Sequence, residues 1–410
     1  MKILMVNKFL YPKGGSEIYM LDLSKKLTDM GHEVFYFGME DEKNTVEVKN
    51  GLAVKNLNFQ SKSLKRVFYP FKTIYSIEAR NKIEKLIKSI NPDIVHLNNY
   101  NYQLTPSIIY AAKKYDIPII QTIHDTNIIC PYHRLYNFKE QKICEKCKGK
   151  KFYHCAATKC VDNSLSKSII ATLEAYTYKY LNTYKHIKYL ICPSRFMAEK
   201  LTEFGVKPSK IRVLYNFTVP NRGKLSGDKK EQVLYFGRIS EEKGIKTLLS
   251  AISDLSNIKF VFVGAGPLSE ELKKYPNIEY AGYKSGDELY DLISQSLFSI
   301  IPSEWYENCP MSILESFSLG TPVIGSNIGG IPELIKNNST GLLYRTGDKD
   351  DLVSKIDELY QNRNKLAEMS KQCVLEADRY SIDNYYGNIL EIYKAAVFRS
   401  TENHLKEIYT

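Results

Sequence analysis

Residues 233–244 read VLYFGRISEEKG, and this stretch shows the pattern that decides the fold. Val233–Phe236 predicts a buried strand, Gly237 marks a turn, and a helical pattern follows Gly244. A strand–turn–helix junction favours anions, because free backbone N–H groups and the helix dipole point at them. Arg238 and Lys243 would place two cations beside it, although both also fit solvated surface charges.

The same alternation of apolar runs and helical patterns continues on both sides of this stretch. Strands are expected at 259–263, 278–280, 298–302 and 322–325, and in the first half at 2–6, 33–37, 93–97, 118–123 and 189–192. This order predicts an α/β fold with two Rossmann-like, doubly wound domains that face each other across a cleft. Residues 221–230 are polar and predict the interdomain linker. We expect domains at 1–220 and 221–385, and a C-terminal helix at 386–410 that returns to the first domain.

The strongest local signal is residues 307–315, ENCPMSILE, in which seven residues separate two glutamates. Pro310 fits the first turn of a helix, so Glu315 would lie on that helix and Glu307 on the loop before it. A carboxylate can accept two hydrogen bonds from the vicinal hydroxyls of a ribose. The alternative is one surface carboxylate and one capping carboxylate, which are common in any protein.

Taken together, these motifs resemble those of the retaining family-4 glycosyltransferases of the GT-B fold. The resemblance rests on Gly237-Arg238, Glu242-Lys243-Gly244, the two glutamates of 307–315 and the stretch 320–324, GTPVI. In the first half, Gly14-Gly15, residues 92–96 (PDIVH), His124 and Pro193-Ser194 also match. It covers nearly the whole chain. It implies a nucleotide-sugar-binding second domain and an acceptor-side first domain.

The resemblance also implies roles for individual residues. Arg238 and Lys243 would contact the donor diphosphate, Glu315 the ribose, and Glu307 and His124 the transferred sugar. The remaining donor-binding candidates are small residues or backbone amides: Gly15, Gly237, Gly264, Asn308, Cys309, Pro310 and Met311. Gly264 follows a strand, and its turn would admit a base. Cations and helix N-termini suffice to stabilise a leaving diphosphate, so no catalytic metal is expected.

Five of the eight cysteines cluster between Cys130 and Cys160, in a polar segment at about 125–161 that predicts an inserted loop. Cys144, Cys147, Cys155 and Cys160 could hold a structural zinc, with Cys130 as an alternative ligand. Free thiols, or a disulfide formed on isolation, are the rival interpretations. The insert resembles one found in a bacterial or archaeal subgroup that builds surface polysaccharides.

The net charge of +11 indicates an anionic partner. Residues 61–90 hold eight basic and two acidic residues. In this stretch Lys62, Lys65, Arg66 and Lys72 flank apolar and aromatic side chains, which favours docking on an anionic membrane surface. No apolar run approaches the roughly 20 residues of a membrane span, and the start reads as a strand rather than a signal peptide. We expect a cytoplasmic enzyme, peripheral on the inner face of the cell membrane.

The predicted function is transfer of a sugar from a UDP- or GDP-sugar to a growing, polyprenyl-linked saccharide in cell-surface polysaccharide biosynthesis. The first alternative is a protein of another class, which binds nucleic acid through its basic charge and a zinc insert. No motif for reading nucleic acid supports it. Another GT-B enzyme, an epimerase or a phosphorylase, is the second alternative. No lysine motif for pyridoxal phosphate supports the phosphorylase.

Overall fold

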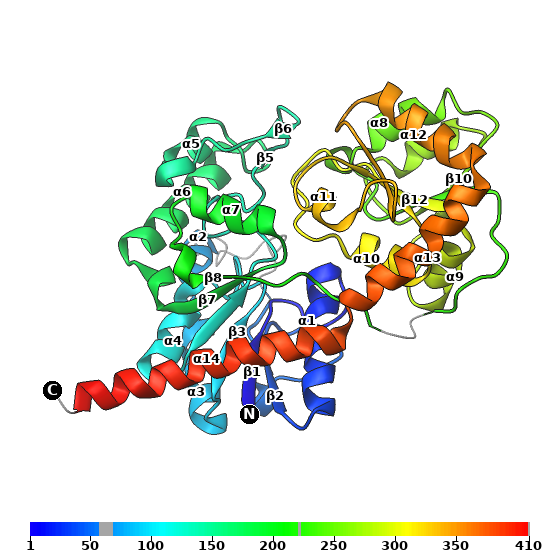
Figure 1. Ribbon diagram of the computed structural model, residues 1–410. Coiled ribbons are helices and arrows are strands. Elements are labelled where there is room, and N and C mark those ends of the chain that lie inside the picture. Colours follow the sequence, from blue (N-terminus) through cyan, green and yellow to red (C-terminus); the bar gives the residue numbers. More distant parts are fainter. Residues whose placement is uncertain (57–68, 220–222, 409–410) are drawn as a thin grey trace.

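Two sheets of parallel strands, each covered by helices on both faces, make up the computed structural model of the chain (Figure 1). The structure describes residues 1–56, 69–219 and 223–408. Both sheets have six strands, as expected for two Rossmann-like domains. The predicted fold class is therefore confirmed.

The N-terminal sheet has the strand order β2-β1-β3-β4-β7-β8. In chain order, the N-terminal half contains β1 (Lys2–Val6), α1 (Gly15–Asp29), β2 (Glu33–Phe37), α2 (Tyr69–Ile74), α3 (Ile77–Ile90), β3 (Ile94–Leu97), α4 (Ile109–Lys114), β4 (Ile119–Thr122), β5 (Tyr136–Asn137), β6 (Lys142–Ile143), α5 (Tyr153–Ala157), α6 (Leu165–Tyr180), β7 (Ile187–Cys192), α7 (Arg195–Glu203) and β8 (Ile211–Val213). Strands β5 and β6 form a small sheet of their own. β3 and β4 are buried along their whole length, as central strands of a parallel sheet require.

The C-terminal sheet has the order β11-β10-β9-β12-β13-β14. In chain order, the C-terminal half of the chain contains β9 (Gln232–Phe236), α8 (Ile245–Ile252), β10 (Lys259–Val263), β11 (Ile278–Gly282), α9 (Asp287–Gln295), β12 (Phe298–Ile301), α10 (Met311–Ser318), β13 (Val323–Ser326), α11 (Ile331–Leu334), β14 (Gly341–Tyr344), α12 (Lys349–Gln361), α13 (Arg363–Arg379) and α14 (Ile382–Ile408). The sequence pattern did not predict β14, which has only four residues.

Local sequence explains where the helices begin and end. Helix α3 starts at Ser76, whose hydroxyl oxygen accepts a hydrogen bond from the Ala79 backbone N–H. It ends at Asn91 in the left-handed conformation. Its buried face repeats at helical spacing and covers the sheet, as the apolar pattern predicted.

The segment predicted as an inserted loop contains more regular structure than expected. Strands β5 and β6 pair as an antiparallel hairpin, and α5 packs against α6. The hairpin lies on the side of the N-terminal half that faces the C-terminal half (Figure 1). The sequence pattern did not reveal these elements, because each strand has only two residues and α5 has five, which is less than two helical turns.

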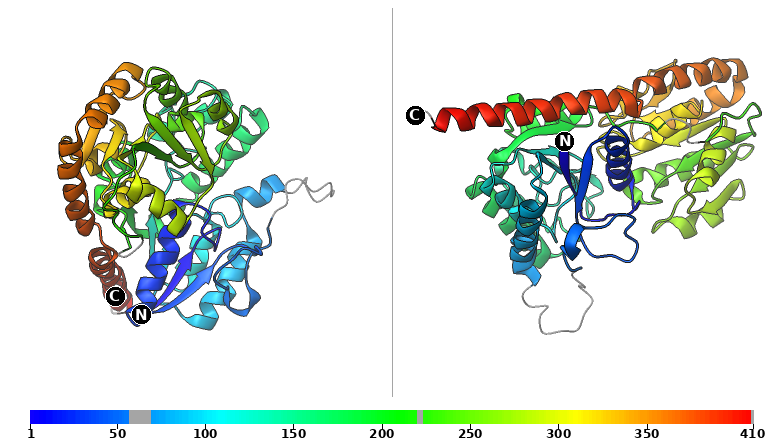
Figure 2. Two further views of the ribbon diagram at one scale, coloured as in Figure 1. Left: turned by 90° about the vertical axis from the view of Figure 1, so that its right-hand side faces the viewer. Right: turned by 90° about the horizontal axis from the view of Figure 1, so that it is seen from below.

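Helix α14 leaves the C-terminal half and lies along the N-terminal domain, as all views agree (Figures 1 and 2). It packs on α1, β3 and β7. The Tyr393 hydroxyl lies 2.8 Å from Nδ1 of the buried His96, and the Tyr385 hydroxyl lies 2.5 Å from that of Tyr19. The last helix thus supplies part of the core of the first domain. The predicted domain boundaries themselves stay a prediction.

Candidate active site

The two sheets bring their switch points to opposite sides of one cleft. Strand order reverses between β1 and β3 in the first sheet, and between β9 and β12 in the second. In doubly wound sheets, ligands bind beyond the carboxyl ends of the strands at such a point. The loops there carry Gly15 in the first half, and Gly237, Lys243 and Glu307 in the second.

A cavity of about 920 Å³ lies between these loops, mostly on the C-terminal side. We call it the large cavity. Nine of its lining residues are ones that the sequence singled out: Gly15, Gly237, Arg238, Lys243, Gly264, Glu307, Pro310, Met311 and Glu315. The structure therefore gathers residues that are up to 300 positions apart in the chain, from Gly15 to Glu315.

Lys243 and Glu307 form an ion pair at the centre of the cleft. The Lys243 Nζ lies 2.5 Å from the Glu307 Oε1, which also accepts hydrogen bonds from the Ser303 hydroxyl (2.7 Å) and the Trp305 Nε1 (2.9 Å). Burial alone would raise the pKa of Glu307, but the charge of Lys243 and these three hydrogen bonds hold the pKa below its ordinary value. Glu307 is thus a buried carboxylate that stays ionised, and it fixes the ammonium beside it.

Arg238 is held by its own turn. Its guanidinium pairs with Glu242, and its Nε donates to the Ser240 hydroxyl at 3.2 Å. A guanidinium has five N–H donors, so these contacts leave donors for an anion. Gly264 (φ +135°) packs so close to the turn that a Cβ there would lie 1.9 Å from the Gly237 carbonyl oxygen. Only glycine fits this contact between the two turns.

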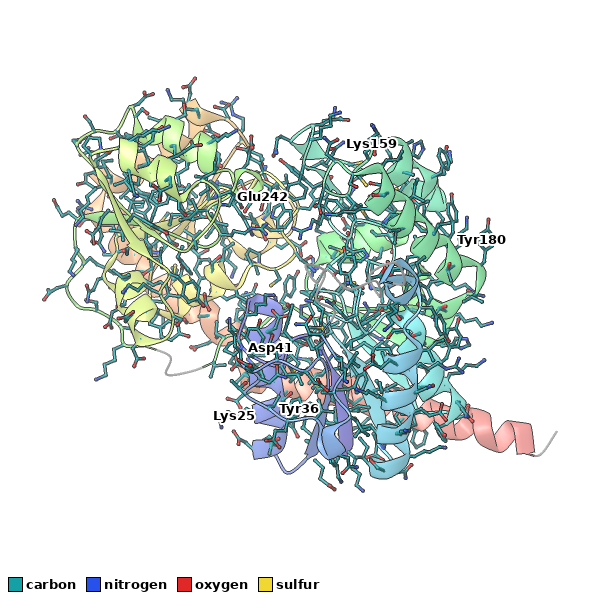
Figure 3. The ribbon with its side chains drawn as sticks, turned by 180° about the vertical axis from the view of Figure 1, so that it is seen from behind. Lys25, Tyr36, Asp41, Lys159, Tyr180 and Glu242 are labelled. Atoms are coloured by element: carbon teal, nitrogen blue, oxygen red, sulfur yellow. The ribbon has the colours of Figure 1, made fainter. Side chains whose placement is uncertain are left out.

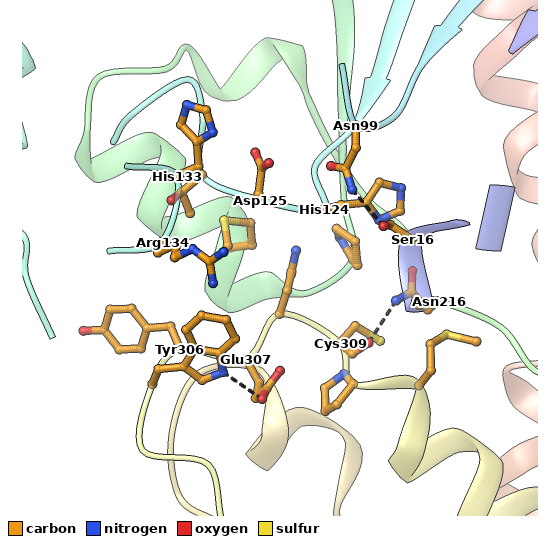
Figure 4. Close-up of a pocket in the computed structure, with 18 of the residues that line it drawn as sticks. Ser16, Asn99, His124, Asp125, His133, Arg134, Asn216, Tyr306, Glu307 and Cys309 are labelled. Atoms are coloured by element: carbon orange, nitrogen blue, oxygen red, sulfur yellow. Dashed lines mark hydrogen bonds between the residues drawn. The ribbon is translucent and has the colours of Figure 1, made fainter. Parts of the chain in front are cut away.

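A second cavity, of about 570 Å³, continues from the first toward the N-terminal domain (Figure 4). We call it the small cavity. Its lining combines His124, Asp125, His133 and Arg134 with Lys8, Tyr102 and Tyr132. Both cavities are lined by Gly15, Lys243, Glu307 and Met311, so they meet at the ion pair. The cleft can therefore hold two molecules in contact.

His124 enters the small cavity at the end of β4. Its Nε2 lies 3.0 Å from the Asn98 Oδ1, so that nitrogen carries the proton and donates. Burial lowers the pKa of His124 to about 3, which keeps the ring neutral at pH 7. Beside it, burial raises the pKa of Asp125 to about 6, although the Asn127 backbone N–H (3.0 Å) and the Asn101 amide (2.6 Å) donate to its carboxylate.

Helix α10 begins at the cleft, as the proline pattern predicted. Pro310 is its N-cap residue, so the backbone amides at its start are free of intrahelical partners. Asn308 and Cys309 precede it and line the small cavity, whereas Glu315 lies one turn into α10 and lines the large one. The two glutamates of the motif therefore face one cleft from a loop and a helix.

Contacts across the cleft hold the two domains together. The Asn308 side chain donates to the Ile123 carbonyl oxygen (2.6 Å) and accepts from the Ser194 hydroxyl (2.8 Å). The Asn216 amide donates to the Cys309 carbonyl oxygen at 2.9 Å (Figure 4). The loop that carries Glu307 is thereby clamped to the first domain. No sequence pattern indicates these pairs, because more than 90 residues separate the partners of each.

Glu333 is a further cross-domain contact that the sequence pattern missed. Its carboxylate accepts hydrogen bonds from the backbone N–H groups of Arg195 (2.8 Å) and Phe196 (2.6 Å), at the start of α7, and from the Tyr215 hydroxyl (2.8 Å). A carboxylate at a helix N-terminus is favoured by the helix dipole. The C-terminal domain thus caps a helix of the N-terminal domain.

The clustered thiols do not form a metal site as placed. The Cys155 and Cys160 Sγ atoms are 2.9 Å apart, whereas two thiolates on one tetrahedral zinc lie about 3.8 Å apart, given Zn–S bonds of about 2.3 Å. Within residues 1–56, 69–219 and 223–408, no group of three or more His, Cys, Asp or Glu side chains is arranged to hold a metal ion. All eight cysteines are free thiols.

The fold and the paired cavities define a class of protein: a two-domain enzyme of the GT-B type. A profile described as Glycosyltransferase Family 4 matches residues 13–222, and one described as Glycosyl transferases group 1 matches residues 221–373. The chain belongs to glycosyltransferase family 4. It is a retaining glycosyltransferase that uses a nucleotide sugar, in a family that works without a metal. This decides between the predicted transferase and the nucleic-acid-binding alternative.

Individual relatives agree with this assignment. An uncharacterised glycosyltransferase of Methanocaldococcus jannaschii is 24% identical and aligns over 97% of this chain and 99% of its own. The O-antigen biosynthesis glycosyltransferase WbnH of Escherichia coli is 30% identical over 53% of this chain and 62% of its own. Among solved structures, HepE of Anabaena in complex with UDP and glucose has a TM-score of 0.67 at 16% identity, covering 96% of this chain and 99% of that one.

Proposed function

We propose that this enzyme transfers a sugar from a UDP-sugar to a growing, lipid-linked saccharide in the synthesis of a cell-surface polysaccharide. The observation that carries the proposal is the meeting of two cavities at the Lys243–Glu307 pair. The large cavity takes the donor and the small cavity takes the acceptor. The reacting groups then meet between the two switch points.

In the large cavity, Arg238 and Lys243 bind the diphosphate. Cleavage of the sugar–phosphate bond puts negative charge on the leaving diphosphate, and fixed cations aimed at that charge stabilise the transition state. The ion pairs with Glu242 and Glu307 hold both cations in place before reaction. Glu315 on α10 binds the ribose hydroxyls. UDP as the nucleotide is supported by HepE, which binds UDP and glucose on the same fold.

The start of α10 and the loop before it bind the transferred sugar. Glu307 and Met311 line both cavities, and Asn308 and Cys309 line the small one, so the backbone N–H groups of Asn308, Cys309 and Met311 lie near the place where the cavities meet. His124 approaches from the first domain as a neutral ring, so it hydrogen-bonds to sugar hydroxyls without adding charge.

In the small cavity, the lining suits a saccharide acceptor. The aromatic rings of Tyr102 and Tyr132 lie beside Asp125 and Arg134. Sugar rings present apolar faces to aromatic side chains and hydroxyls to charged ones, so such a lining binds sugars. The insert that follows β4 supplies Tyr132 and Arg134, and thus sets which acceptor fits.

The lipid carrier and the membrane location belong to the same proposal. WbnH, a relative, acts in O-antigen biosynthesis by its name, and a growing surface polysaccharide of that kind suits a membrane-anchored acceptor. Among the described residues, no helix is long and apolar enough to cross a membrane. We therefore propose a cytoplasmic enzyme attached to the inner face from outside the bilayer. Lys62, Lys65 and Arg66, which the sequence favoured for docking, lie outside the described residues, whereas Lys72 is exposed on α2.

Two hypotheses made from the sequence stay open to test here. The division into domains at 220 and 385 assigns acceptor binding to the first and donor binding to the second. A structural zinc on Cys144, Cys147, Cys155 and Cys160 requires the distance between the last two Sγ atoms to increase by about 1 Å, to the spacing of two thiolates on a tetrahedral zinc. Metal analysis of protein purified without chelator tests the zinc: one zinc per chain supports it, and a metal-free, folded protein ends it.

Thermal-shift screening against UDP, GDP, ADP and CDP tests the donor. A nucleotide at 100 times its dissociation constant stabilises the fold by about 2.7 kcal/mol. We expect UDP to raise the melting temperature and CDP, ADP and GDP to leave it unchanged at the same concentration. A shift with GDP alone would correct the nucleotide, and no shift with any of them would contradict the donor site.

A further inference from the structure

Helix α6 packs with its polar side toward the protein and its apolar side toward solvent, the reverse of the usual packing of a surface helix. A helix on a sheet normally buries its large apolar residues and exposes polar ones. The residues that α6 buries are small or polar apart from one tyrosine: Ser168, Ala171, Thr172, Glu174 and Tyr178. Its exposed residues include Leu165 (49% exposed), Ile169 (42%), Leu173 (52%) and Tyr180 (78%).

These four exposed side chains form one continuous stripe. Leu165, Ile169 and Leu173 are four residues apart, and Tyr180 follows seven after Leu173, so all share one side of the helix. Tyr153 on α5, 52% exposed, adds an aromatic ring from the neighbouring helix. We call these five residues the α6 face. Figure 3 shows Tyr180 at the outer edge of the N-terminal domain.

The helix that carries the stripe is firmly held. The Tyr176 ring lies 5.5 Å from the Phe152 ring, and its hydroxyl accepts a hydrogen bond from the Tyr153 backbone N–H at 3.3 Å. Tyr178, on the buried side, donates its hydroxyl to the Ile74 carbonyl oxygen of α2 at 2.5 Å. The exposure of the stripe therefore follows from a fixed orientation of the helix.

The segment that carries the α6 face has an excess of basic residues. Residues 150–181 contain five lysines and two acidic residues: Lys150, Lys151, Lys159, Lys167, Lys179, Asp162 and Glu174. Glu174 is buried, and Asp162 is paired with Lys167 at 2.7 Å. The Lys179 Nζ lies 5.1 Å from the centre of the Tyr176 ring and 5.7 Å from that of Tyr180. The Lys179 cation thus lies beside Tyr180 of the α6 face, in a segment whose lysines outnumber its acidic residues.

We propose that the α6 face docks on an anionic lipid leaflet. A helix with apolar side chains on one side and lysines at its rim lies in the interface of a membrane, with the apolar residues among the acyl chains and the cations at the headgroups. A second copy of the chain is a poorer occupant, because a two-fold interface would bring the same lysines of both copies together. The surface therefore complements lipid rather than itself.

The α6 face adjoins the proposed acceptor side of the cleft. Tyr132 lines the small cavity, and its hydroxyl donates to the Asp162 Oδ1 at 3.0 Å, just before the start of α6. Docking would hold that wall of the cavity close to the lipid surface. This step rests on the proposed function, since it gives a lipid-linked acceptor a short path to the cleft, whereas the docking itself does not depend on it.

Sedimentation with vesicles tests the docking on the full chain. Wild type is mixed with vesicles of phosphatidylcholine alone and of phosphatidylcholine with phosphatidylglycerol. The test variant carries Leu165→Ser, Ile169→Ser and Leu173→Ser. The matched control carries Met30→Ser, Leu225→Ser and Leu375→Ser, which are 49%, 60% and 61% exposed and lie elsewhere. A third variant, Lys151→Gln with Lys159→Gln and Lys179→Gln, removes charge only.

We expect wild type and the matched control to bind the anionic vesicles alike and to ignore the neutral ones. The test variant should lose about tenfold or more in partitioning, and the charge variant should bind weakly and with less dependence on salt. Equal binding by the test variant, or no binding by wild type, would overturn the proposal. A wild-type dimer in sedimentation velocity that the test variant converts to monomer would also overturn it, because the face would then join two copies.

The nucleotide thermal shift, measured on the same samples, separates this proposal from the proposed function. All variants should keep the wild-type shift, because none of the substituted residues lines the large cavity. Vesicle binding without any nucleotide shift would leave the docking intact and contradict the donor site. A nucleotide shift without vesicle binding would do the reverse.

Discussion

Replacing Lys243 by methionine should separate the two tasks that the structure gives this side chain. The ammonium neutralises Glu307, whose carboxylate is 11% exposed, and it faces the large cavity where we place the diphosphate. Lys243→Met keeps the length of the side chain and removes its charge. It should therefore lower both the stability of the fold and the rate of sugar transfer.

The two effects have different expected sizes. Removing one partner of a fully buried ion pair costs about 3–5 kcal/mol, and because the Lys243 side chain is 23% exposed we expect a smaller loss, about 2–3 kcal/mol. Loss of one fixed charge that stabilises a transition state costs about 100-fold or more in rate. Adding Glu307→Gln should restore most of the stability, since no unpaired charge remains, but none of the rate.

Chemical denaturation and release of nucleoside diphosphate from the donor measure these two quantities. Lys246→Met is the matched control: its ammonium pairs with Glu241 at 2.6 Å, is 56% exposed and lies outside both cavities. It should change stability by less than about 1 kcal/mol and leave the rate unchanged. A folded Lys243→Met enzyme with a near-normal rate would refute the donor assignment. Failure of the double variant to recover stability would refute the account of the ion pair.

Four further outcomes follow from the same structure. Glu315→Ala should leave the melting temperature of the free enzyme within a few degrees of wild type and abolish the UDP-induced shift; an unchanged UDP shift would remove Glu315 from the ribose site. Activity should survive EDTA in a short assay, because Arg238 and Lys243 supply the charge at the diphosphate; a strict need for Mg²⁺ or Mn²⁺ would contradict this. Burial raises the pKa of Glu174 from 4.5 to about 8, so over that range the folded chain keeps a proton that the unfolded chain has lost, and stability falls as pH rises. Glu174→Gln should therefore stabilise the fold, and the gain should be larger at pH 8 than at pH 5. At pH 7 we expect the free energy of unfolding to rise by about 3 kcal/mol in denaturation curves; a gain independent of pH would exclude this titration. Glu333→Ala should widen the cleft, seen as a larger radius of gyration in X-ray scattering, because the start of α7 loses its partner from the other domain; an unchanged radius would show that the remaining contacts suffice.

Periodicity and turn residues were enough to predict the sheets. Long apolar runs such as 259–263 match β10 at both ends, because a central parallel strand must be apolar on both faces. The four-residue strand β14 escaped, since its sequence GLLY has no β-branched residue, whereas predicted strands of the same length, such as β12 (FSII), do. In the site, glycine turns and the glutamate pair stood out because special backbone geometry and cleft-facing charge restrict the residue type. Trp305, Ser303 and Glu333 did not, because their roles arise only when distant segments meet.

The inverted packing of α6 was also out of reach of the sequence. Its apolar residues repeat at helical spacing, which a reader of the pattern assigns to a core-facing side. Only the structure, in which Thr172 and Glu174 lie on the buried side of the helix, shows that the polar side faces inward. Which side of an amphipathic helix faces inward is decided by its neighbours.

The return of α14 to the first domain has a consequence for how the chain folds during synthesis. The strands of the N-terminal sheet end at Val213, but the helix that supplies Tyr385 and Tyr393 to its core begins only at Ile382. At about 5–20 residues per second, the ribosome needs on the order of ten seconds or more to deliver it. Until then His96 lacks its tyrosine partner and the apolar surface under α14 stays open. The second domain, whose strands are made in one uninterrupted run, can fold while the first still waits, so the domain that is synthesised first is completed last.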